Sequence, residues 1–218
     1  MKNLLKPASI MIGAFFGVLA LSNSANAQGD ATAGKAKTVA CSACHGADGN
    51  SPAAIYPSIA GLGEKYILKQ LKDIKSEKRA IPEMTGQLTA MSEQDLQNMA
   101  AFYASQSLAL TGAKELTVKL NSGEETDGLK LGEALYRFGN AEAGVPSCTG
   151  CHSPTGQGNA PAGYPRLGGQ HADYIAKQLK AFRNGERVND SEMAMRAIAK
   201  NMSDSDIASV SAYIAGLH

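Results

Sequence analysis

Tryptophan is absent from this chain of 218 residues, and aromatic residues account for only 6% of it. A sequence so poor in large side chains has little material with which to fill hydrophobic cores. An excess of either charge is missing too, since 21 basic residues balance 20 acidic ones. Because the sequence carries no basic stripe, binding to nucleic acid is not expected.

A hydrophobic run long enough to span a bilayer is also missing. The one extended apolar run, 10–21, is shorter than the roughly 20 residues that a spanning helix needs. Lys2 and Lys6 precede this run and Ala25-Asn26-Ala27 follows it, which is typical of a secretory signal peptide. We therefore predict a signal peptide, 1–27, cleaved after Ala27, with a membrane anchor as the alternative. The mature protein should be exported, to the periplasm in a Gram-negative source.

Cysteine occurs only within two copies of the string Cys-x-x-Cys-His, at 41–45 and 148–152, so no thiol is left over for a disulfide. In an exported protein this string is typical of covalent attachment of c-type haem. Two thiols can bond the two vinyl groups of one porphyrin, and the histidine that follows can then ligate the iron. The motifs predict two covalently bound haem c groups. Their thioethers would come from Cys41, Cys44, Cys148 and Cys151, and their first axial ligands would be His45 and His152.

Two other uses of Cys-x-x-Cys fit the sequence less well. Zinc ribbons pair two such motifs across roughly 15–20 residues, whereas more than a hundred residues separate Cys44 from Cys148. A thioredoxin-like dithiol would need a βαβ context, and no strand-rich pattern of that kind surrounds either motif. A buried porphyrin would also supply apolar contact area that the side chains lack.

The surroundings of the motif recur along with it. Three blocks repeat in the same order: Tyr56-Pro57 with Tyr164-Pro165, 66–72 with 174–180, and 92–96 with 203–207. Such a repeat indicates two copies of one domain. We predict an N-terminal domain at 28–110 and a C-terminal domain at 128–218. The polar segment 111–127 between them should be a linker that lies over the surface.

Each copy is predicted to be helical, which makes the fold class all-α. Apolar residues at helical spacing predict helices at 31–40 and 64–76 in the first copy, and at 129–137 and 171–182 in the second. The closing helices should begin at Ser92-x-x-Asp95 and Ser203-x-x-Asp206, where serine and a carboxylate can cap the free N–H groups.

The second axial ligand should recur in register if it is a methionine. Two pairs satisfy this condition: Met84 and Met195, each eight residues before a capping serine, and Met91 and Met202, each directly before it. An apolar residue before a helix cap commonly packs on the first turn, which explains Met91 and Met202 without a ligand role. We therefore favour Met84 and Met195 as axial ligands.

Four further residues are candidates for a supporting role. The carbonyls of Pro57 and Pro165 could accept a hydrogen bond from the ligating histidines, although turn prolines would show the same spacing. Arg79 and Arg187 match in the repeat and could pair with haem propionates or be exposed. His171 and His218 have no histidine counterparts in the first copy and are expected at the surface.

Taken together, these motifs resemble the dihaem cytochrome c4 family. The resemblance covers nearly all of the mature chain and includes the phrases Glu83-Met84-Thr85-Gly86 and 165–171. It implies two tandem class I cytochrome c domains related by an approximate twofold, with His/Met ligation of both irons. It further implies a periplasmic carrier that associates loosely with the membrane and passes electrons towards haem–copper oxidases.

The sequence thus predicts a one-electron carrier of a respiratory chain and not an enzyme. Its partners would be membrane respiratory complexes, such as a haem–copper oxidase or a cytochrome bc complex, or other redox proteins. The alternatives are the cytochrome subunit of a periplasmic dehydrogenase and a dihaem peroxidase. A peroxidase needs an open iron with acid–base groups above it, and no histidine is close in sequence to either methionine segment.

Overall fold

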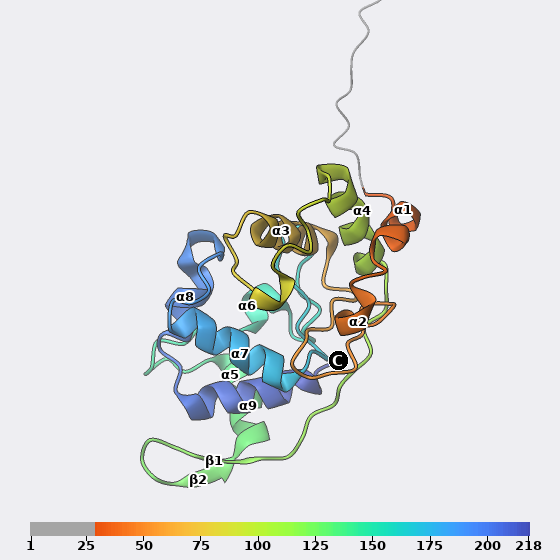
Figure 1. The fold of residues 1–218 in the computed structure, drawn as a ribbon. Coiled ribbons are helices and arrows are strands. Elements are labelled where there is room, and N and C mark those ends of the chain that lie inside the picture. The colour runs from red at the N-terminus through yellow and green to blue at the C-terminus, as the bar shows by residue number, and fades with distance from the viewer. Residues whose placement is uncertain (1–28) are drawn as a thin grey trace, which may run out of the picture.

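The computed structural model describes residues 29–218, so the predicted signal peptide and its cleavage site lie outside the described residues. Two similar sets of helices follow one another along the chain, and Figure 1 shows α1, α3 and α4 of the first set above α5, α7 and α9 of the second. The first set is α1 (Ala31–Lys37), α2 (Ser42–His45), α3 (Glu64–Lys75), η1 (Pro82–Met84) and α4 (Glu93–Ala104). The second set is α5 (Gly128–Phe138), α6 (Thr149–His152), α7 (Ala172–Arg183), η2 (Ser191–Met193), α8 (Ala194–Ala199) and α9 (Asp204–Ala215).

In each set the first and last helices cross at a glycine. A Cβ added to Gly34 of α1 would lie 2.0 Å from the carbonyl oxygen of Asn98 in α4. A Cβ added to Gly132 of α5 would lie 2.2 Å from the carbonyl oxygen of Ser209 in α9. Only glycine allows backbones to approach this closely, so the two crossings are built in the same way.

The two closing helices begin with the predicted capping boxes. The Ser92 hydroxyl accepts the Asp95 N–H at 3.1 Å, and the Asp95 carboxylate accepts the Ser92 N–H at 2.9 Å. Ser203 and Asp206 exchange the same two bonds at 3.1 and 2.9 Å. The prediction of both helix starts is confirmed.

Replacing either capping serine with alanine should lower the free energy of unfolding by about 1 kcal/mol, because an N–H at the helix start loses its acceptor. Chemical denaturation of the holoprotein measures this loss for Ser92→Ala and Ser203→Ala. Ser122→Ala is the control, since the exposed Ser122 hydroxyl accepts the Glu124 N–H at a long 3.4 Å and caps no helix. Losses no larger than that of the control would contradict the capping role.

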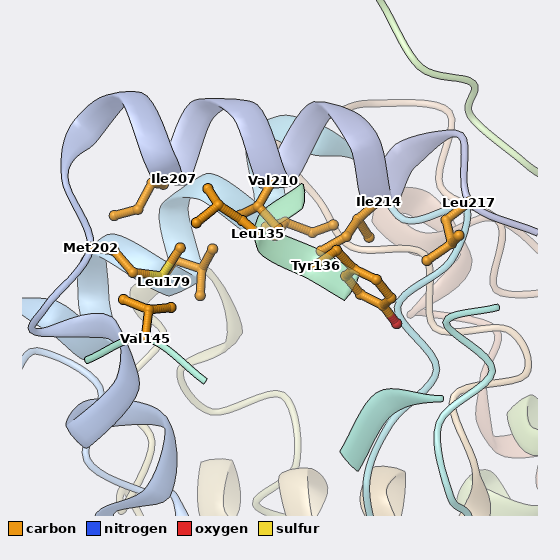
Figure 2. Close-up of a cluster of buried hydrophobic side chains, with 10 residues drawn as sticks. Leu135, Tyr136, Val145, Leu179, Met202, Ile207, Val210, Ile214 and Leu217 are labelled. Atoms are coloured by element: carbon orange, nitrogen blue, oxygen red, sulfur yellow. The ribbon is translucent and has the colours of Figure 1, made fainter. Parts of the chain in front are cut away.

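A separate hydrophobic core fills each domain. In the C-terminal domain, the side chains of α9 pack against α5 and α7 (Figure 2), and Tyr136 of α5 is fully buried. The N-terminal core joins α3 to α4 in the same way. Its buried members are Leu62, Ile67, Leu71, Leu88, Leu96, Met99, Ala100, Phe102 and Tyr103.

The predicted linker contains more structure than expected. Strands β1 (Thr117–Lys119) and β2 (Glu125–Asp127) form a two-stranded antiparallel hairpin with Val118 opposite Thr126. Val118 is buried, and β1 contacts α9. The segment is polar overall, so the sequence did not predict that one buried apolar residue, Val118, docks the hairpin on the C-terminal domain.

Helix ends differ from the predicted ones by one to three residues, and one segment differs in kind. No helix was predicted around Met195, yet it lies in α8, while Met84 ends the short helix η1. Glu192 and Met193, just before α8, both have left-handed backbone angles (φ of 51° and 56°). Among residues 29–218, none of the helices has the length and apolar character needed to cross a bilayer.

Candidate haem sites

Each Cys-x-x-Cys-His string folds into a single helical turn. The His45 N–H donates to the Cys41 carbonyl at 3.0 Å, and the His152 N–H donates to the Cys148 carbonyl at 2.9 Å. One turn of helix brings residues three and four positions apart onto the same face. Both thiols of a motif and its histidine are therefore next to each other in each domain.

Burial raises the pKa of the Cys41 thiol. The pKa of the Cys148 thiol is raised to about 11, mainly by burial and to a smaller extent by the charge of the nearby Cys151. Reactive Cys-x-x-Cys dithiols have lowered thiol pKa values instead. The surroundings of the two motifs therefore differ from those of a thioredoxin-like redox centre.

Both motif histidines are buried and held through one ring nitrogen. His45 Nδ1 lies 2.9 Å from the Pro57 carbonyl oxygen, and His152 Nδ1 lies 3.0 Å from that of Pro165. A carbonyl only accepts, so Nδ1 carries the proton and Nε2 keeps its lone pair for a metal. Burial also lowers the pKa of both imidazoles, which favours the neutral form that ligation requires. The predicted role of the proline carbonyls is confirmed.

A tyrosine ring lies near each imidazole in an edge-type arrangement. The ring centroids of Tyr56 and His45 are 6.4 Å apart, those of Tyr164 and His152 are 6.2 Å apart, and both pairs meet at 65°. In the sequence these tyrosines are recognisable only as part of the repeat. Their recurrence directly before each proline was the signal that could have pointed to this contact.

The structure places each favoured methionine against the same core as one cysteine of its motif. Met84 and Cys41 pack on the N-terminal core, and Met195 and Cys148 pack on the C-terminal core. Of the competing pair, Met202 is itself a buried core residue, 6% exposed. Met91 is partly buried against the N-terminal core.

Arg79 and Arg187 lie between the two domains, where each reaches into the other copy. Arg79 donates to Tyr174 Oη at 2.9 Å and to Gln178 Oε1 at 3.0 Å. Arg187 donates to Tyr66 Oη at 3.3 Å and to Gln70 Oε1 at 3.1 Å. Reciprocal contacts between equivalent residues are what a twofold axis produces. These six residues are called the arginine cluster below.

The arginine cluster carries more positive charge than its protein neighbours neutralise. The ion pairs formed within 29–218 include neither guanidinium, and the neighbouring carboxylate of Asp73 is paired with Lys69. Arg79 is nevertheless buried, and it lines a cavity of about 320 Å³ together with Met84. A buried cation without an anion is unfavourable. Carboxylates such as haem propionates would therefore fit here, and the expectation that these arginines are simply exposed is wrong.

Comparison with known proteins agrees with this geometry. The cytochrome c family model matches twice, at residues 31–107 and 130–218. Cytochrome c4 of Pseudomonas aeruginosa is 52% identical over 201 residues, which cover 92% of this chain and 94% of that protein. The chain belongs to the dihaem cytochrome c4 family. A crystal structure of reduced recombinant cytochrome c4 from Pseudomonas stutzeri superposes with a TM-score of 0.80 at 48% identity. The match covers 87% of this chain and all of that one.

Membership in the cytochrome c4 family means that the protein is a dihaem electron-transfer cytochrome and not an enzyme. Two haem c groups are bound covalently at the two motifs, and the fold consists of two mainly helical cytochrome c domains. A thiosulfate dehydrogenase electron acceptor of Stutzerimonas stutzeri is also similar. It is 36% identical over 180 residues, which cover 82% of this chain and 79% of that protein.

Proposed function

We propose that this cytochrome carries single electrons in the periplasm between respiratory complexes, towards a membrane haem–copper oxidase. The observation that carries the proposal is the matched pair of sites, each with a neutral, buried histidine held at Nδ1 and a methionine on the same core. When bound, each haem supplies an iron that cycles between ferrous and ferric states.

In this proposal His45 and Met84 ligate the N-terminal iron, and His152 and Met195 ligate the C-terminal iron. Imidazole and thioether ligation leaves no position for substrate and favours electron transfer. The proline carbonyls hold the imidazoles in place, so the ligands need to move little when charge changes. Arg79 and Arg187 would pair with propionates at the boundary between the domains.

We further propose the domain bounds 28–110 and 128–218, with 111–127 as the connection, and a signal peptide cleaved after Ala27. A peroxidase is no longer a candidate, because the family is one of electron-transfer proteins. The periplasmic dehydrogenase alternative is retained, since one relative is named as an electron acceptor of thiosulfate dehydrogenase. In that case the donor would be such a dehydrogenase instead of a cytochrome bc complex.

The purified reduced holoprotein should not bind carbon monoxide, because in this proposal a histidine and a methionine would ligate each iron and leave no open position. It should also be oxidised rapidly by membranes that contain a haem–copper oxidase. Absorption spectra with and without carbon monoxide, followed by stopped-flow oxidation, measure both properties. Carbon monoxide binding at either iron would overturn the proposed ligation. Rapid reduction by thiosulfate dehydrogenase, together with no reaction with the oxidase, would favour the dehydrogenase alternative.

A further inference from the structure

The hydrogen bonds that join the two domains near the ligating histidines are not symmetric. Gln170, in the C-terminal domain, is 3% exposed and reaches Ser58 of the N-terminal domain. Its Oε1 accepts the Ser58 N–H at 2.9 Å, and its Nε2 donates to the Ser58 carbonyl at 2.7 Å. The neighbouring His171 Nε2 lies 2.9 Å from the Ser51 carbonyl oxygen, so His171 is an interdomain residue and the expectation of a surface histidine is wrong.

Gln170 acts on the peptide group that holds the N-terminal histidine. The Ser58 N–H and the Pro57 carbonyl belong to one peptide unit, and that carbonyl accepts the His45 Nδ1–H at 2.9 Å. An acceptor on the N–H side of a peptide polarises it and makes its carbonyl a better acceptor. Ser58 is 2% exposed, so water does not compete for this bond. The connection therefore runs from the C-terminal domain through one peptide to the His45 imidazole.

The C-terminal histidine lacks this connection. In the repeat, the positions of Gln170 and His171 correspond to Leu62 and Gly63, which have no side chain able to reach across in the same way. Within the part of the chain that the structure describes, no side chain from the first domain accepts the N–H of Arg166, the counterpart of Ser58. Only one of the two matched proline carbonyls is thus polarised by the other domain.

We propose that Gln170 is a positioning residue through which the C-terminal domain tunes the iron potential of the N-terminal domain. The inference rests on the proposed ligation of the N-terminal iron by His45. A stronger hydrogen bond at Nδ1 gives the imidazole more anionic character and makes it a more basic ligand. A more basic ligand stabilises ferric iron. Gln170 therefore lowers the potential of the N-terminal haem and leaves that of the C-terminal haem unchanged.

The test replaces Gln170 with the residue that the first copy holds at this position. In Gln170→Leu the ferric–ferrous equilibrium of the N-terminal iron should shift about three- to tenfold towards the ferrous state. For a one-electron couple, a tenfold shift corresponds to a rise in potential of about 59 mV. Potentiometric titration measures both potentials of the holoprotein. In the reduced protein, the NMR signal of the His45 Nδ1–H should move upfield and exchange faster with water, while that of His152 should stay in place.

Two further variants separate tuning from a merely loosened interface. Gln170→Glu keeps an oxygen facing the Ser58 N–H in either protonation state. The potential of the N-terminal haem in this variant should therefore lie at or below that of the wild type. His171→Phe removes the other contact but leaves the Pro57 peptide untouched, and it should shift the N-terminal potential by less than Gln170→Leu. Equal shifts in all three variants, or equal shifts at both haems, would overturn the proposal.

An unchanged His45 signal and unchanged potentials in a folded Gln170→Leu protein would also overturn the proposal. Failure of the underlying ligation would look different. In that case the wild-type reduced protein itself would lack the signals of two iron-bound imidazoles.

Discussion

Met84→Ala should open one of the two irons, and Met195→Ala should open the other. Each variant is expected to lose half of the weak near-infrared methionine–iron band and to bind carbon monoxide at one site when reduced. The potential of the affected haem should fall, because a thioether ligand favours ferrous iron. Near-infrared absorption and carbon monoxide titration of the purified holoproteins measure these effects.

The competing methionines are the matched controls for this experiment. Met202 is buried in the C-terminal core, so Met202→Ala should cost about 2–5 kcal/mol of stability and leave the near-infrared band intact. Met91→Ala should leave the band intact at a smaller cost, because Met91 is only partly buried. Loss of the band in either control, or its full retention in Met84→Ala, would reverse the ligand assignment.

Arg79→Ala should lower the free energy of unfolding by about 3 kcal/mol, since hydrogen bonds to a buried charged group contribute more than those between neutral groups. The variant removes one hydrogen bond from each of Gln70, Tyr174 and Gln178 at the domain boundary, although Arg187 still donates to both glutamines. Arg79→Lys should recover little of this loss, because an ammonium cannot reproduce the fork of a guanidinium. Chemical denaturation of the holoproteins measures both changes.

Arg183→Ala is the control for the arginine cluster. Arg183 pairs with Asp204 at the surface, so removing it should cost less than about 1 kcal/mol. Tyr174→Phe combined with Arg79→Ala completes a double-mutant cycle across the boundary. Coupling near zero, with a cost for Arg79→Ala no larger than that of the control, would show that the cluster does not join the domains.

The haem motifs, the capping boxes and the proline carbonyls could all be predicted, because each depends on residues close together in the chain. The internal repeat extended this reach, since a ligand common to both copies had to recur in register. That condition reduced eight methionines to two pairs. The hairpin within 111–127 was not expected, because its docking depends on a single buried residue, Val118.

Local patterns and the internal repeat did not predict the contacts between the two copies. His171 was expected at the surface, because a residue without a counterpart in the repeat carries no periodic signal, yet it contacts Ser51 across the boundary. Arg79 and Arg187 were recognised as a matched pair, but their partners from the opposite copy were not. Pairings between residues about a hundred positions apart leave no local pattern in a single sequence.

By itself the sequence determined what the protein is, since covalent attachment, capping and repetition are encoded within short segments of chain. Only the tertiary structure decided how the two halves differ. Gln170 polarises the Pro57 peptide and not the Pro165 peptide, because folding brings one face of the second domain against the first domain's histidine loop. Two nearly identical segments acquire different surroundings when each packs against the other, and a hydrogen bond depends on those surroundings more than on the segment itself.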